Sequence, residues 1–370
     1  MGPVEGTSRV ASSVRKKRPA RVLFASLLFS VFYFALFPYP LGREPVARPR
    51  WAVAVPASAD LRSSQPGLPS WPFQLGSRFG YVHADGSVLF AGTALYRVAL
   101  STTAFVNYTR LGTDWILQDS SGQRLASFSG SGYPLLGPDG NRIFNVKTDL
   151  SGIIELDKSG SALWERDFPA LMTTLSLQGD SLVVGLLNGS LLLINRQGSP
   201  LVQYAPGGSR IPVILGSALS ADGSLVAALS GIGPQYLTVL RRQATGYAPI
   251  AAVGLATDFR REVRMGFSPD SRWLYLEGQD AAGIFDPAAA SLRWVKLRGR
   301  LAGGAFAWAG RYAAVASLES GRTQLAIEPP AGIAVYREEF PAREVYLGSI
   351  ENGILMGWDG LLLRIDIEAM

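Results

Sequence analysis

Five arginines form the most concentrated charge in the body of the sequence and are the first candidates for chemistry. They are Arg241, Arg242, Arg260, Arg261 and Arg264. Arginine pairs with carboxylate and phosphate groups through its planar fork of N–H donors. The cluster therefore predicts a binding surface for an acidic protein partner, an anionic glycan or a lipid headgroup. The alternative interpretation is a solvated loop whose charge is balanced by Asp258 and Glu262.

Residue types that carry catalysis are scarce. The sequence has no cysteine, which excludes disulfides, thiolate metal sites, cysteine nucleophiles and a lipid attached to cysteine. It has one histidine, His83, so a His-based zinc site has no second nitrogen or sulfur ligand, and a Ser-His-Asp triad would have to use His83. We interpret His83 as a strand residue beside a turn. The sequence predicts no catalytic residue, no metal and no cofactor.

Four aspartates recur at similar intervals: Asp139, Asp180, Asp222 and Asp270. Calcium ligands or paired catalytic carboxylates are one interpretation of such a series. Each aspartate, however, stands in a short segment that contains glycine or serine, where an Asp side chain accepts hydrogen bonds from the backbone of a turn. We therefore interpret them as turn residues that mark the ends of strands.

The net charge of +6 is concentrated in a short N-terminal stretch. Residues 1–21 hold six basic residues and one acidic residue, 6 − 1 = +5, so the rest of the chain carries 6 − 5 = +1. A nucleic-acid-binding domain spreads basic residues over its working face. Basic residues directly ahead of an apolar run are instead typical of membrane topology, and no nucleic-acid partner is predicted.

An apolar segment follows the basic residues. Val22 to Phe37 contains no charged residue, and the uncharged stretch continues to Leu41. A membrane-spanning helix needs about 20 residues. The sequence thus predicts a single-pass signal anchor at 22–41, a cytoplasmic tail at 1–21 and an extracytoplasmic or periplasmic C-terminal domain on the inner membrane. The alternative is a cleaved signal peptide with a small-residue site at Ala57-Ser58-Ala59.

Beyond this segment the composition changes twice. Residues 42–74 are rich in proline, which lacks the N–H that helices and central strands need, so we expect an extended tether there. From 75 to 370, short runs of Val, Leu, Ile, Tyr and Phe alternate with Gly, Asp, Asn and Ser. That pattern predicts an all-β domain.

Internal repeats favour one all-β fold. A turn sequence recurs at equal spacing at Asp119-Ser120-Ser121-Gly122, Asp157-Lys158-Ser159-Gly160 and Asn195-Arg196-Gln197-Gly198. A second turn series precedes it by a shorter and similarly regular interval, as at Pro138-Asp139-Gly140. Two interleaved series are typical of four-stranded blades. We predict a β-propeller of about seven blades, at 96–131, 133–170, 172–207, 212–254, 263–299, 303–341 and 344–368, with six or eight blades as the alternatives. The hairpin Phe79 to Phe90 should complete the last blade by pairing with Leu361 to Glu368.

These repeats resemble a known family. Leu171 to Tyr204 is similar to a pyrroloquinoline-quinone-like (PQQ-like) propeller repeat, Asp157 to Trp164 resembles the tail of that repeat, and Phe267-Ser268-Pro269-Asp270 resembles the entry of a WD-repeat blade. The resemblance implies a propeller. Its catalytic members hold quinone and calcium, often with adjacent cysteines, which this sequence lacks. Other members assist outer-membrane protein assembly.

Taken together, these features predict a non-catalytic, membrane-anchored propeller that serves as a protein-interaction or assembly scaffold for an envelope protein. The alternatives are a propeller enzyme, either quinoprotein dehydrogenase-like or carbohydrate-active, and a sensor of a small ligand or glycan that uses the central channel. Fold analogy alone supports the enzyme, and function resides in sites rather than folds.

Overall fold

The computed structural model describes residues 18–36, 45–56, 69–307, 310–330, 332 and 334–369. The chain divides into two units, Met1–Pro45 with Ala369–Met370, and Val46–Glu368. Most of the predicted basic tail, the end of the predicted anchor and residues 57–68 of the predicted tether lie outside the described residues, as does the candidate cleavage site Ala57-Ser58-Ala59.

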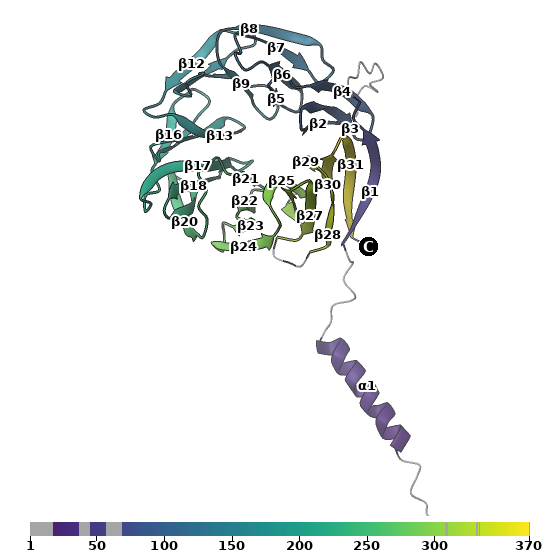
Figure 1. Cartoon of the computed structure of the whole chain (residues 1–370). Coiled ribbons are helices and arrows are strands. Elements are labelled where there is room, and N and C mark those ends of the chain that lie inside the picture. The colour runs from purple at the N-terminus through teal and green to yellow at the C-terminus, as the bar shows by residue number, and fades with distance from the viewer. Residues whose placement is uncertain are drawn as a thin grey trace, which may run out of the picture. The chain divides into compact units, whose positions relative to one another are not determined.

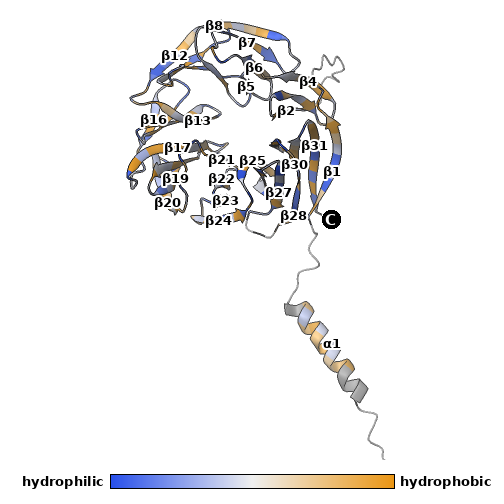
Figure 2. Ribbon diagram, viewed as in Figure 1, coloured by the Kyte–Doolittle hydropathy of each residue, from blue (hydrophilic) through white to orange (hydrophobic). Residues whose placement is uncertain are grey.

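The first unit contains helix α1 (Arg18–Leu36), whose apolar middle is visible in Figure 2. The prediction of a transmembrane helix at 22–41 was wrong. Within the described part of the chain, no helix combines the length and apolar character that a membrane crossing requires.

The described residues of the second unit form eight antiparallel sheets, called blades here and arranged in a ring (Figure 1). Blade 1 consists of β2 (Ser70–Leu75), β3 (Arg78–His83) and β4 (Val88–Thr93). Blade 2 consists of β5 (Arg97–Leu100), β6 (Ala104–Tyr108), β7 (Asp114–Asp119) and β8 (Arg124–Ser129). Blade 3 consists of β9 (Tyr133–Leu136), β10 (Ile143–Val146), β11 (Gly152–Leu156) and β12 (Ala162–Asp167). Blade 4 consists of β13 (Met172–Gln178), β14 (Ser181–Leu186), β15 (Leu191–Ile194) and β16 (Pro200–Tyr204).

The remaining blades continue the ring. Blade 5 consists of β17 (Ile211–Leu219), β18 (Leu225–Ile232), β19 (Gln235–Gln243) and β20 (Gly246–Leu255). Blade 6 consists of β21 (Met265–Phe267), β22 (Leu274–Gly278), β23 (Ala281–Asp286) and β24 (Ser291–Lys296). Blade 7 consists of β25 (Arg300–Ala307), β26 (Tyr312–Glu319), β27 (Arg322–Glu328) and β28 (Tyr336–Pro341). Blade 8 consists of β29 (Val345–Ile350), β30 (Gly353–Trp358), β31 (Leu361–Ala369) and, as its outermost strand, β1 (Pro45–Ala54).

The hydrophobic core lies between neighbouring blades. One cluster joins blades 3 and 4 through Phe144, Ile153 and Leu182, and another joins blades 5 and 6. A strand in the middle of such a sheet is covered on both faces, so every residue of β14 is buried. Burial on both faces explains why this strand is a continuous apolar run rather than an alternating one.

The predicted number of blades was wrong, and the ring has eight. The seven predicted segments match blades 2 to 8, but Phe79 to Phe90 belongs to a blade of its own. Within blade 1, Tyr81 is opposite Phe90 and Phe73 is opposite Gly80. The missing strand, β2, was hidden in the predicted tether because Pro72 interrupts its apolar pattern. β2 lies at the edge of its sheet, where proline is tolerated since one side of the strand needs no ladder bonds.

Closure of the ring also differs from the prediction. The neighbours of β31 are β30 and β1, not the hairpin of blade 1. Arg50 on β1 donates from Nε to Oδ2 of Asp366 at 2.8 Å and also pairs with Glu368. The N–H of Val55, just after β1, donates to the carbonyl of Gly360 at 2.8 Å. An N-terminal edge strand, with its own prolines, therefore completes the C-terminal blade.

Three of the four turn aspartates accept hydrogen bonds from the backbone of their turns, as predicted, whereas Asp180 pairs with Arg196 at 3.0 Å. Oδ1 of Asp139 accepts the N–H of Asn141 at 3.0 Å, and Oδ1 of Asp222 accepts the N–H of Ser224 at 3.0 Å. The hydrogen bond from Asn141 lowers the pKa of Asp139. His83 is the last residue of β3 and precedes a tight turn, also as predicted.

Candidate binding site

The topology brings residues from several blades to one face of the ring. In each of blades 2 to 8 the innermost strand is the first along the chain, if the N-terminal strand β1 of blade 8 is left aside (Figure 1). Because successive strands are antiparallel, a blade of four strands returns the chain to the face at which the blade began. The innermost strands β5, β9, β13, β17, β21, β25 and β29 therefore all begin at the same face, which we call the strand-start face. Residues at or just before these strands surround the same opening.

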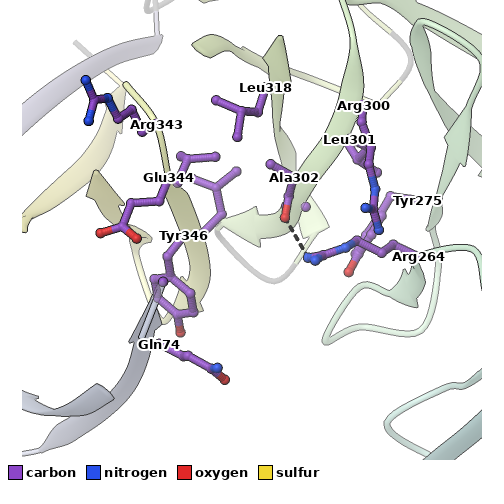
Figure 3. Close-up of a pocket in the computed structure, with 15 residues that line it drawn as sticks. Gln74, Arg264, Tyr275, Arg300, Leu301, Ala302, Leu318, Arg343, Glu344 and Tyr346 are labelled. Carbon is purple, nitrogen blue, oxygen red and sulfur yellow. Dashed lines mark hydrogen bonds between the residues drawn. The ribbon is translucent and has the colours of Figure 1, made fainter. Parts of the chain in front are cut away.

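Three arginines occupy this position in consecutive blades. Arg264 precedes β21, Arg300 begins β25, and Arg343 lies two residues before β29. They line a pocket of about 580 Å³. Figure 3 shows Arg264, Arg300 and Tyr275 on one side, and Arg343, Glu344, Tyr346 and Gln74 on the other. Blades 6, 7, 8 and 1 thus contribute together.

A buried carboxylate organises the blade 6 side of this pocket. Glu277 is 1% exposed and pairs with Arg261 at 2.7 Å and with Arg300 at 3.6 Å. The backbone N–H of Arg264 donates to the same carboxylate at 3.3 Å. Hydrogen bonding to Glu277 raises the pKa of Arg261. Arg264 is held further by donation from Nη1 to the carbonyl of Ala302 at 2.6 Å, the dashed line in Figure 3.

The opposite side of the pocket has polar groups without partners. Among the described residues, the side chains of Gln74, Arg343 and Glu344 make no hydrogen bond or ion pair. Their backbone is nevertheless fixed, since the N–H groups of Arg343 and Glu344 donate to Oδ1 of Asp359 at 2.8 and 3.2 Å. A guanidinium, a carboxylate and an amide therefore lie at the pocket with their hydrogen-bonding capacity unused.

Two tyrosines line the pocket, one on each side (Figure 3). Burial raises the pKa of Tyr346 to about 12 and also raises the pKa of Tyr275. The hydroxyl of Tyr346 donates to the carbonyl of Pro72 at 2.9 Å, which ties blade 8 to blade 1. Within the described lining there is no Ser, Thr, Cys, His or Lys. No group of three or more metal-ligating side chains lies together in the described part of the chain. The polar side chains of the lining are those of arginine, tyrosine, glutamine and glutamate.

The five arginines singled out from the sequence do not form one surface. Arg264 lines the pocket and Arg261 is engaged by Glu277, while Arg260 is exposed beside Asp258, at 3.5 Å.

Arg241 and Arg242 lie at the opposite face of the ring. β19 begins at the strand-start face and ends at the opposite face, and both arginines stand near its end. Arg241 is paired with Leu225, and the N–H of Arg242 donates to the carbonyl of Ser224 at the turn before β18. Arg300, Arg343 and Glu344 were missed. The repeat could have revealed the arginines. Arg264, Arg300 and Arg343 follow one another at intervals close to the blade period and stand at equivalent positions in successive blades.

Gly76 sets the position of Glu344, and its replacement is a direct test of this part of the site. Its φ is +56°, and a Cβ there would overlap the Glu344 carboxylate. We expect Gly76→Ala to displace Glu344 and to lower the free energy of unfolding by about 1–2 kcal/mol through left-handed backbone strain. Chemical denaturation measures the loss.

The matched control is Gly179→Ala, where φ is +52° and no atom lies within 4 Å of the added Cβ. It shares the backbone strain but not the overlap, so binding at the pocket should change in Gly76→Ala alone. Equal binding by both variants would mean that Glu344 plays no part in the pocket.

Comparisons with known proteins agree with this architecture. A family model described as "beta-propeller protein" matches residues 14–370. An uncharacterized protein of Treponema pallidum (strain Nichols) is 25% identical over 365 residues, which cover 96% of each chain. BamB from Moraxella catarrhalis is similar in structure, with a TM-score of 0.59 and 14% identity over 87% of this chain and 100% of that one.

The computationally designed Ika8 protein is equally similar, with a TM-score of 0.59 and 13% identity, covering 85% of this chain and 96% of that one. At these levels of identity, the similarities to solved structures concern the fold.

Proposed function

We propose that this chain, which belongs to the beta-propeller protein family, is a non-catalytic docking platform that holds an acidic segment of a partner protein in the Arg264–Arg300–Arg343 pocket. The observation that carries the proposal is Arg343, an exposed residue of the pocket lining whose guanidinium has no partner among the described residues. An arginine whose donors are unused can pair with a carboxylate in bidentate fashion.

The charge balance around the pocket supports an acidic ligand. Arg261, Arg264, Arg300 and Arg343 face two carboxylates, Glu277 and Glu344, which leaves an excess of two positive charges, 4 − 2 = +2. Glu277 is buried beneath the arginines and is not available to a ligand. A rigid ring that presents fixed charges loses little entropy on binding. Since most of the arginine side chains are exposed, attraction to an acidic segment should weaken as salt is added.

We place this docking in the cell envelope, outside the cytoplasm, with an envelope protein as the partner. The basic residues ahead of the apolar run Val22 to Phe37 are typical of exported chains, and the absence of cysteine suits an oxidising compartment. A mature chain that began at Asp60 would lack β1 and with it the outer strand of blade 8. We therefore expect the exported domain to retain residues 45–54, which mass spectrometry of the mature N-terminus and cell fractionation test together.

The direct test is crosslinking in intact cells followed by affinity capture. The informative variant is Arg343→Glu, because Arg343 has no structural ion pair to lose. Its control is Arg272→Glu, an exposed arginine in a groove of the opposite face that also contains Arg241. We expect the wild type and Arg272→Glu to capture the same envelope protein, and Arg343→Glu to capture at least about tenfold less, as loss of a charge-assisted pair predicts.

A second variant distinguishes loss of binding from loss of folding. Arg343→Gln removes the charge without adding a new one and should lose part of the captured protein while melting at the wild-type temperature. Capture of the same partner by Arg343→Glu and Arg272→Glu in equal amounts would refute docking at this pocket. Failure to recover any partner reproducibly would refute the docking function itself.

A further inference from the structure

A second pocket opens on the strand-start face, between blades 2, 3 and 4, and tyrosines form much of its wall. Its volume is about 430 Å³, and its lining includes Tyr96, Tyr108 and Tyr133. The rings of Tyr96 and Tyr108 meet edge to face at 6.4 Å, and those of Tyr108 and Tyr133 lie 6.3 Å apart. Tyr108 is buried, whereas Tyr96 is 44% exposed and offers its ring to a ligand.

Two oppositely charged side chains reach this pocket from different parts of the ring. Arg97 begins β5 in blade 2, and Glu262 stands in the connection between β20 and β21. This connection is pinned next to Glu262, since the N–H of Val263 donates to the carbonyl of Leu215 at 2.7 Å. The guanidinium of Arg97 lies over the ring of Tyr96, 5.5 Å from its centroid.

Neither charged group is satisfied by the protein. Among the described residues, the Arg97 guanidinium and the Glu262 carboxylate make no hydrogen bond and no ion pair, with each other or with any other side chain. Both residues are exposed at the pocket, and partial desolvation raises the pKa of Glu262, which the charges of Arg264 and Arg97 oppose. Groups held in this state at a concave aromatic surface are the polar contacts that fix a ligand's orientation in a binding pocket.

We propose that this pocket binds a neutral sugar unit of a glycan. A sugar presents apolar C–H faces, which pack on aromatic rings such as that of Tyr96, and a rim of hydroxyls. Arg97 donates to hydroxyl oxygens, and Glu262 accepts from hydroxyl hydrogens, so one ring can satisfy both.

The pair of Arg97 and Glu262 has no net charge, so it favours a ligand without net charge over a simple anion or cation. Among such ligands, a neutral sugar with many hydroxyls also uses the exposed ring of Tyr96, which a small zwitterion does not need. Glycoside hydrolysis commonly needs two carboxylates flanking the bond. The described lining holds a single carboxylate, Glu262, so the pocket is assigned to binding and not to cleavage. The site is separate from the arginine pocket and does not depend on the docking proposal.

The test is binding of the full chain to an array of neutral and anionic glycans, followed by calorimetric titration of the neutral glycan with the highest signal. We expect saturable binding that is unchanged by added salt, in contrast to docking at the arginine pocket. Glu262→Gln and Arg97→Gln should each weaken it about tenfold or more, since a hydrogen bond to a charged group contributes about 1.5–3 kcal/mol. Tyr96→Ala should weaken it about threefold or more, because an exposed aromatic face is lost.

Controls separate this site from its neighbour. Glu344→Gln changes the arginine pocket and should bind the glycan as the wild type does, while Arg343→Glu should lose the protein partner and keep the glycan. Absence of binding to every neutral glycan on the array would overturn the proposal. So would wild-type affinity in Glu262→Gln, or saturable binding of tetramethylammonium or acetate at this pocket in place of a sugar.

Discussion

Deletion of Leu361–Met370 will abolish cooperative unfolding of the ring. The deletion removes β31, which lies between β30 and β1 in blade 8. Leu362, Ile365 and Ile367 are 0%, 6% and 1% exposed. Full burial of one such side chain contributes about 1.5–3 kcal/mol, so the three together contribute about 5–9 kcal/mol. That loss is comparable with the whole stability of a typical domain, about 5–15 kcal/mol. The deletion also leaves β1 without its partner strand and exposes an edge of β30.

Differential scanning calorimetry measures this effect on the purified domain. The matched control is a chain that begins at Pro45, which keeps β1 and all of blade 8 and should melt as the full chain does. Single variants test the same effect in smaller steps. Ile365→Ala or Ile367→Ala should each lower the free energy of unfolding by about 2–5 kcal/mol, because each leaves a cavity. A cooperative transition near the wild-type temperature after the deletion would mean that β31 does not hold the two chain ends together.

Replacement of Arg142 by methionine should cost about 3–5 kcal/mol, because it leaves a carboxylate buried without its counter-ion. Arg142 and Glu155 are each 4% exposed and pair through two hydrogen bonds, at 2.8 and 2.7 Å. The indole N–H of Trp164 donates to the same carboxylate at 2.6 Å. Arg142 also packs over the ring of Phe144, at 4.8 Å from its centroid. One arginine therefore neutralises a charge inside blade 3 and covers part of the core there.

The double variant Arg142→Met/Glu155→Leu is the decisive comparison. Removing both charges removes the uncompensated carboxylate, and apolar replacements of similar volume are often neutral for stability. We expect the double variant to recover more than half of the loss, with the indole of Trp164 still donating to the carbonyl of Arg196 at 3.0 Å. Chemical denaturation of the wild type, both single variants and the double variant closes the cycle. A double variant less stable than Arg142→Met would show that the pair itself, and not charge burial, carries the stability.

Much of the propeller follows from local chemistry and could be predicted without coordinates. Asp-Gly and Asn-Gly turns at a fixed period mark the ends of hairpins, since tight turns need residues that accept positive φ. Gly122, Gly160 and Gly198 have φ of +86°, +90° and +76°, as the repeated turn requires. These signals correctly predicted an all-β propeller and the segments of blades 2 to 8. The aspartates in the second turn series were also predicted correctly as turn residues.

The first blade and the closure could not be predicted in the same way. β1 and β2 contain Pro45, Pro49 and Pro72, and a local pattern cannot distinguish a tether from an edge strand. The pairing of β1 with β31 joins opposite ends of the chain, as the Arg50–Asp366 bond shows with a sequence separation of 316. Such long-range pairing leaves no local signal.

The arginines show most clearly what the sequence determined and what the tertiary structure determined. The sequence by itself determined the turns, the strands and their period, because those depend on backbone conformation and on neighbouring residues. It could not determine that Arg241 and Arg264, close in the sequence, lie on opposite faces, nor that Arg264, Arg300 and Arg343 meet at one pocket. The tertiary structure decided both, because strand direction assigns a residue to a face and ring closure brings equivalent positions of successive blades around one opening. The same geometry places Glu262 and Arg97, which are far apart in the sequence, at the wall of one pocket.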